Sequence, residues 1–98
     1  MASDTVIRPS REAVFRELAD GTGVILHLNT TAYHGVNRTG VVIWRLLESN
    51  RTFEGLVKEL RSRLDGAPPN LETEVAEFVN DLRDRELVVF GNYDPAGS

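Results

Sequence analysis

The chain has 98 residues, of which 41% are hydrophobic and 27% charged, and these proportions are typical of one globular domain. No apolar run approaches the roughly 18 residues needed to cross a membrane, and the N-terminus lacks the apolar stretch of a signal peptide. Cysteine is absent, which excludes disulfides, thiolate metal ligands and a cysteine nucleophile. We therefore expect a cytoplasmic protein without a membrane partner.

The net charge of −4 is concentrated in one segment of the chain. Residues 70–87 contain six acidic and two basic residues, whereas acidic and basic residues balance in the rest of the sequence. An acidic segment repels phosphate backbones and attracts basic partners. The same pattern is typical of a solvent-exposed helix face, and charge alone does not separate the two interpretations.

The N-terminal half of the chain is expected to form a small sheet. Residues 1–11 are polar and contain Pro9, so we expect a flexible tail there. Three β-prone segments follow, at residues 13–18, 23–28 and 32–36, separated by the turn sequences Asp20-Gly21 and Asn29-Thr30-Thr31. Two tight connections predict an antiparallel three-stranded sheet, whose apolar face must be covered by helices.

The apolar pattern changes from strand to helix at Asn37, whose side chain can accept hydrogen bonds from the first free amides of a helix. A first helix is expected over residues 38–49, with Trp44 at the centre of the core. Thr52 is a suitable cap for a second helix, whose apolar residues form one stripe at positions 53, 56, 57, 60 and 64.

Residues 65–69 (DGAPP) end the second helix, because prolines lack amide donors and disfavour helix before them. Asn70 is expected to cap a third helix, with an apolar stripe at positions 71, 75, 78, 79 and 82. Residues 87–90 form a short β-prone run, and residues 91–98 are expected to be a second flexible tail. The sequence thus predicts one α+β domain over residues 12–90, with a three-stranded antiparallel sheet followed by three helices in a winged helix-turn-helix-like arrangement.

The sequence contains few residues that indicate catalysis. His27 and His34 lie near each other across the expected hairpin, but two imidazoles without a third ligand do not predict a metal site. A phosphate-binding loop and a Gly-x-Ser-x-Gly element are both absent from the sequence. We therefore expect no catalytic residues, no metal and no cofactor.

Two binding functions remain from the residues alone. A winged helix would read DNA with its last helix, but here that helix is acidic and the basic patch of a nucleic-acid binder is missing, so we expect no nucleic acid. The expected third strand contains neither a full charge nor a proline, the usual devices that block an open sheet edge. An uncharged edge beside a helix predicts a groove that binds a peptide as an added strand.

The sequence resembles the PqqD-like family, also called RiPP recognition elements, over roughly residues 12–90. The resemblance is carried by residues 14–16, 24–26 and 32–33, by residues 53–60, by residues 75–87, and above all by the element Asn37-x-Thr39-Gly40 with Ile43-Trp44. The sequence departs from the family at Glu86, where many relatives have glycine, which concerns the local turn rather than the fold.

The resemblance implies a non-catalytic protein that binds the leader region of a ribosomally made precursor peptide. In the family the leader pairs with the third strand and lies against the third helix. Standalone members similar to this chain serve lasso peptide biosynthesis, where the partners are a leader peptidase and an ATP-dependent cyclase. The alternative within the family is PqqD itself, which presents its precursor to a radical enzyme.

Placed on this sequence, the resemblance implies three groups of leader-binding residues. The expected backbone partners are Thr31, Ala32, Tyr33, His34, Gly35 and Val36. The apolar wall would consist of Leu71, Val75, Phe78 and Leu82, and the polar rim of Glu74, Asp81 and Arg85. Periodicity does not separate the helix positions that face the groove from those that face the core.

Overall fold

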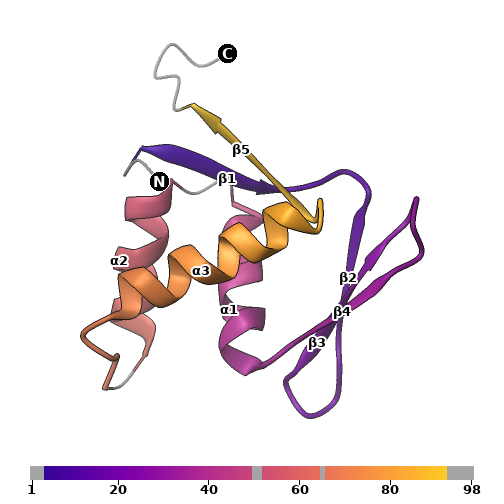
Figure 1. Cartoon of the computed structure of the whole chain (residues 1–98). Helices are drawn as coiled ribbons and strands as arrows, with labels where there is room; N and C mark the ends of the chain where they lie inside the picture. Colours follow the sequence, from indigo (N-terminus) through magenta and orange to yellow (C-terminus); the bar gives the residue numbers. More distant parts are fainter. Residues whose placement is uncertain (1–3, 50–51, 65, 93–98) are drawn as a thin grey trace.

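The computed structural model describes residues 4–49, 52–64 and 66–92 (Figure 1). Its elements in chain order are β1 (Thr5–Pro9), β2 (Ala13–Glu17), β3 (Gly23–His27), β4 (Tyr33–Val36), α1 (Arg38–Leu47), α2 (Phe53–Arg63), α3 (Leu71–Asp84) and β5 (Val88–Asn92). The sheet β2-β3-β4 is antiparallel and precedes the three helices, which confirms the predicted α+β class and its central element order. Residues 1–3 and 93–98 of the two expected tails, and residue 65 of the expected helix stop, lie outside the described residues.

The prediction of flexible tails is wrong for residues 5–9 and 91–92, which belong to strands. Thr5–Pro9 form β1, which pairs antiparallel with β5 from Thr5↔Asn92 to Pro9↔Val88 and forms a second, two-stranded sheet (Figure 1). Ile7 is fully buried in the core, and β5 extends two residues past the expected end of the domain. The pairing joins the two ends of the sequence, so no local pattern in either segment indicated it.

Two of the three predicted helix caps are present. The side chain of Asn37 accepts from the backbone N–H of Gly40 at 2.8 Å, and that of Thr52 accepts from the N–H of Gly55 at 3.1 Å. The predicted cap at Asn70 is wrong, because its backbone is not extended (φ −97°, ψ 24°) and its side chain makes no capping hydrogen bond. The N–H of Leu71 instead donates to the carbonyl of Pro68.

The core lies between the three helices, the inner face of the three-stranded sheet and the buried side of β1 and β5. Trp44 is 2% exposed, as predicted, and stacks on the ring of Phe15 from β2 with the centroids 6.0 Å apart. The predicted apolar stripes of α2 and α3 are buried at the positions Phe53, Leu56, Val57, Leu60, Leu71, Val75, Val79 and Leu82. Among the described residues, no helix combines the length and the apolar character that a membrane span requires.

At the end of α3, Glu86 occupies a backbone position that favours glycine. Glu86 has φ 61°, and the N–H of Leu87 reaches back to the carbonyl of Leu82 at 2.9 Å. This is the Schellman arrangement, in which the residue after the helix adopts the left-handed conformation that glycine takes at least cost.

Glu86→Gly should therefore raise the free energy of unfolding by about 0.5–1 kcal/mol, because glycine relieves the left-handed backbone while losing some chain entropy. Urea unfolding followed by tryptophan fluorescence measures the change. Arg85 has φ −90°, so Arg85→Gly should bring no such gain. A Glu86→Gly protein less stable than the parent would contradict this explanation.

Candidate functional site

The strand β4 lies at one edge of the three-stranded sheet, and among the described residues it pairs with β3 alone. The N–H of His27 donates to the carbonyl of Ala32 at 3.0 Å, so these two residues form a hydrogen-bonded pair. In an antiparallel ladder, bonded and non-bonded pairs alternate. His34 and Val36 therefore bond to β3, whereas the N–H and C=O groups of Tyr33 and Gly35 face the open edge.

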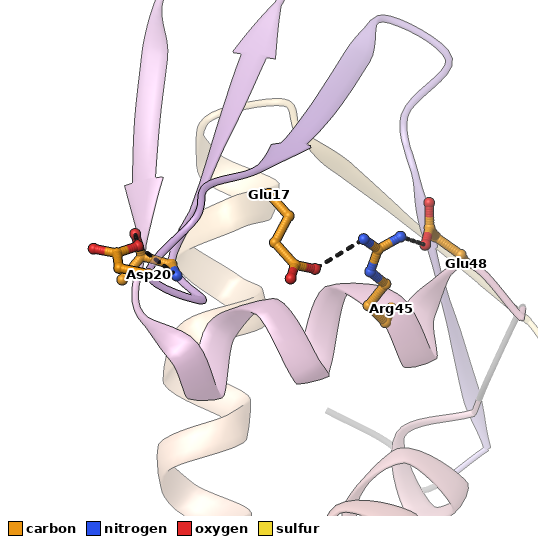
Figure 2. A network of polar contacts seen from close by, with 5 residues as sticks. Glu17, Asp20, Arg45 and Glu48 are labelled. Carbon is orange, nitrogen blue, oxygen red and sulfur yellow. Dashed lines mark hydrogen bonds and ion pairs between the residues drawn. The ribbon is translucent and has the colours of Figure 1, made fainter.

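The opposite edge of the sheet, formed by β2, is protected by charge. The carboxylate of Glu17 accepts from the guanidinium of Arg45 on α1 at 2.9 Å, and Arg45 also lies 3.8 Å from Glu48 (Figure 2). Charged side chains along an edge strand disfavour the addition of another strand. Because β4 carries neither a full charge nor a proline, it is the edge more open to strand addition.

The C-terminal half of α3 meets β4 through a polar cluster. His34 Nε2 lies 3.8 Å from Asp81 Oδ2, and the same oxygen accepts from Arg85 Nε at 3.1 Å. Burial lowers the pKa of His34, and the positive charge of Arg85 lowers it further, while Asp81 acts in the opposite direction. His34 is therefore neutral at pH 7 and can offer a donor and an acceptor beside the open edge.

Because the pKa of His34 is lowered from 6.5 in the folded protein, its neutral form stabilises the fold above pH 6.5. That stability should be lost as the pH falls from 6.5 through the lowered value. An NMR titration of the imidazole should give a midpoint below 6.5. Unfolding in urea should show wild type losing stability relative to His34→Gln between pH 7.5 and pH 5. A midpoint above 6.5 would mean that the attraction of Asp81 dominates instead.

A pocket of about 200 Å³ lies past the end of β4, and the open edge of β4, the polar cluster of α3 and this pocket will together be called the groove. The pocket itself will be called the α1–α3 pocket, and its lining residues are Asn37, Thr39, Gly40, Ile43, Leu60, Leu71, Glu74, Val75 and Phe78. A side chain at Gly40 would lie 3.0 Å from Val36 and 3.1 Å from the ring of Phe78. The absence of a side chain at Gly40 thus lets the end of β4, the start of α1 and Phe78 meet at one point.

The expected binding residues of α3 lie along the groove, but they differ in how far they are buried. Leu71, Val75 and Leu82 are at most 2% exposed, so they belong chiefly to the core, and Leu71 and Val75 reach the pocket only at its floor. Phe78 is half-buried and forms part of the pocket wall. Glu74 is exposed at the pocket rim, and Arg85 is exposed in the polar cluster with the half-buried Asp81.

The expected strand residues differ in whether they belong to β4 and in how exposed they are. Thr31 lies before β4 in a left-handed conformation (φ 59°), and its N–H already donates to the carbonyl of His27 at 2.7 Å. Ala32 also precedes β4, so the strand begins one residue later than predicted. Tyr33 is 73% exposed and its side chain lies on the outer face of the sheet. Gly35 has open space where a side chain would be, and Val36 is buried.

The helix α1 contributes residues to the pocket that periodicity did not indicate. Asn37, Thr39, Gly40 and Ile43 line the α1–α3 pocket, although none was expected among the binding residues. The signal was present in the Asn-x-Thr-Gly element. Its asparagine caps the helix, and its glycine leaves room for Phe78.

The description "Coenzyme PQQ synthesis protein D (PqqD)" belongs to the family model that matches residues 22–88. A solved structure of TbiB1 in complex with the TbiA(beta) leader peptide is 30% identical, with a TM-score of 0.75, and the match covers 89% of this chain and 99% of that one. A lasso peptide synthetase B1 complexed with the leader peptide is 19% identical, with a TM-score of 0.72 over 85% of this chain and 96% of that one, and shows a shared fold. No curated protein sequence gave a significant match. The chain therefore belongs to the PqqD family, whose small domains are also called RiPP recognition elements.

Proposed function

We propose that this chain is a non-catalytic protein that binds the leader region of a ribosomally made precursor peptide. The leader adds as a strand to the open edge of β4 and lies against α3. The observation that carries the proposal is the uncharged edge at Tyr33 and Gly35, in the strand that leads into the α1–α3 pocket at Asn37. The relative TbiB1, of similar length and 30% identical, is described in complex with a leader peptide, which supports the proposal.

Each part of the groove has a physical role in this binding mode. The outward N–H and C=O groups of Tyr33 and Gly35 form main-chain hydrogen bonds to the leader, and these bonds supply affinity for any extended peptide. Specificity comes from side-chain contacts, because the α1–α3 pocket with Phe78 accepts an apolar leader side chain. Glu74 and Asp81 give the rim an acidic character, which favours a leader with basic residues and increases its association rate.

We further propose that the bound precursor is delivered to a leader peptidase and an ATP-dependent cyclase in lasso peptide biosynthesis. The similarity to TbiB1 favours this pathway. The family model, by contrast, carries the description of a coenzyme PQQ synthesis protein, which favours presentation of a precursor to a radical enzyme as the second candidate. DNA binding is disfavoured by the acidic third helix, which would meet phosphates with like charge.

A fluorescence-polarisation titration tests the proposal. One labelled probe is the leader peptide of a precursor identified from the genes that flank this chain's gene, and the TbiA(beta) leader peptide is the second probe. We expect a Kd between nanomolar and micromolar, which corresponds to about −12 to −8 kcal/mol. Absence of binding by both peptides at high micromolar protein would overturn the proposal. A labelled DNA duplex that binds instead, with affinity falling steeply as salt rises, would favour the winged-helix alternative.

A further inference from the structure

A second and larger cavity lies at the other end of β4, beside the turn that joins β3 to β4. It is an open depression in the surface with a volume of about 520 Å³ and will be called the β5 cavity. Its lining residues are Ser10, Glu12, His27, Asn29, Arg83, Glu86, Val88, Val89 and Phe90. Because the C-terminal end of α3 and the β3–β4 turn both contribute to it, a peptide that follows β4 toward that turn would reach this cavity.

His27 is the buried polar residue of this cavity, with only 6% of its surface exposed. Its Nδ1 accepts from the backbone N–H groups of Asn29 at 3.2 Å and Thr30 at 3.4 Å. A nitrogen that accepts hydrogen bonds carries no proton, so the neutral ring has its proton on Nε2. No hydrogen bond from Nε2 to another described residue is present. His27 therefore brings an unused N–H donor to the cavity.

Glu12 brings a carboxylate with one unpaired oxygen to the lining of the same cavity. Its Oε2 atom is enclosed and has no hydrogen-bond partner among the residues that the structure describes. A buried carboxylate oxygen without a donor is unfavourable, and a cation is the partner that satisfies it best. Because Oε2 has no accessible surface, a guest in the cavity reaches the carboxylate at its other oxygen, Oε1, and offsets the negative charge that Oε2 leaves unpaired.

The remaining lining residues favour a basic guest with an apolar stem. The guanidinium of Arg83 lies over the ring of Phe90 at 4.9 Å and within 3.9 Å of Asp84, so its charge is already partly compensated. The carboxylates of Glu12 and Glu86 then leave the lining negative. The lining also includes Val88, Val89 and Phe90 of β5, whose accessible apolar atoms can pack against the methylene groups of a lysine or arginine side chain.

We propose that the β5 cavity is a second subsite, which binds a basic side chain of the bound peptide at the end of β4 opposite the α1–α3 pocket. The ammonium or guanidinium group donates to the carboxylate of Glu12. A carbonyl of the peptide accepts from His27 Nε2. The role of this subsite rests on the proposed leader binding, and it gives the leader a requirement for a basic residue at a defined distance from the strand-forming segment.

An NMR titration of the ¹⁵N-labelled full chain tests the subsite without a leader. The probes are Nα-acetyl-arginine amide and Nα-acetyl-citrulline amide, which have nearly the same shape but differ in charge. The arginine probe should produce saturable shifts at the amides of Glu12, Asn29 and Phe90. The citrulline probe should not. Glu12→Gln should weaken the arginine response at least fivefold, whereas the matched charge change Glu72→Gln, on the first turn of α3, should leave it unchanged.

The subsite is overturned if the arginine probe gives no saturable shift at the lining residues, or if the citrulline probe binds equally well. Its failure is distinguishable from failure of the proposed function. If the leader binds but the arginine probe does not, the subsite is contradicted and strand addition at β4 still stands. If the arginine probe binds in the cavity but no leader binds, strand addition is contradicted instead.

Discussion

Gly35→Pro should lower the affinity for the leader peptide about 10- to 100-fold, or about 1.4–2.8 kcal/mol. The register places the N–H of Gly35 on the open edge, so proline removes a donor that β3 does not use. The lost hydrogen bond contributes about 0.5–1.5 kcal/mol, and the proline ring occupies the place of the added strand. Fluorescence polarisation of the labelled leader measures the change.

The matched control at the same position is Gly35→Ala. Nothing lies within 4 Å of the position that its side chain would take, and alanine keeps the N–H. Alanine should therefore leave both affinity and stability nearly unchanged. Proline should also leave the fold intact, because edge strands accept proline where the N–H faces solvent. A folded Gly35→Pro protein that binds the leader like wild type would exclude strand addition at β4.

Phe78→Ala should weaken leader binding by about 2 kcal/mol, which is roughly 30-fold. The half-buried ring of Phe78 forms a wall of the α1–α3 pocket and contacts the start of α1 at Gly40. Truncation to alanine removes the apolar surface against which a leader side chain would pack. The affinity is measured by fluorescence polarisation at a protein concentration corrected for the folded fraction.

The control for Phe78 is another half-buried phenylalanine outside the groove. Phe15 packs on Trp44 from β2, so Phe15→Ala should lower the free energy of unfolding without changing the affinity of the folded protein. If both variants lose affinity to the same extent, the loss in Phe78→Ala arises from lower stability and not from a lost contact with the leader. Normal binding by folded Phe78→Ala would remove Phe78 from the site.

Much of the fold was predictable because its signals are local. Asn37 and Thr52 cap the helices that follow them, and the apolar stripes of α2 and α3 are the buried ones. The strand β1 was not predictable in this way, because Ile7 is buried by pairing with a segment more than 80 residues away. The cap at Asn70 was predicted wrongly because residue type does not reveal the backbone conformation, and the backbone of Asn70 is not extended.

The candidate site was predictable in outline from a resemblance, not from periodicity. Periodicity assigns Leu71, Val75 and Phe78 to one stripe of α3, and only the packing shows that Phe78 is half-buried whereas the other two are fully buried. Whether the N–H of Gly35 faces the open edge depends on the register between β3 and β4. A slip of one residue would move every side chain of β4 to the opposite face of the sheet. The β5 cavity depends on β5 and on the end of α3, whose positions the sequence left open.

Amide hydrogen exchange tests the central claim most directly. In the free protein the N–H groups of Tyr33 and Gly35 face the open edge and should exchange fast, whereas those of His34 and Val36 are bonded to β3 and should exchange slowly. Saturation with the leader peptide should slow Tyr33 and Gly35 at least about tenfold, because both amides then donate to the added strand. Exchange at these two amides that stays fast while the peptide is bound would contradict strand addition and place the leader elsewhere.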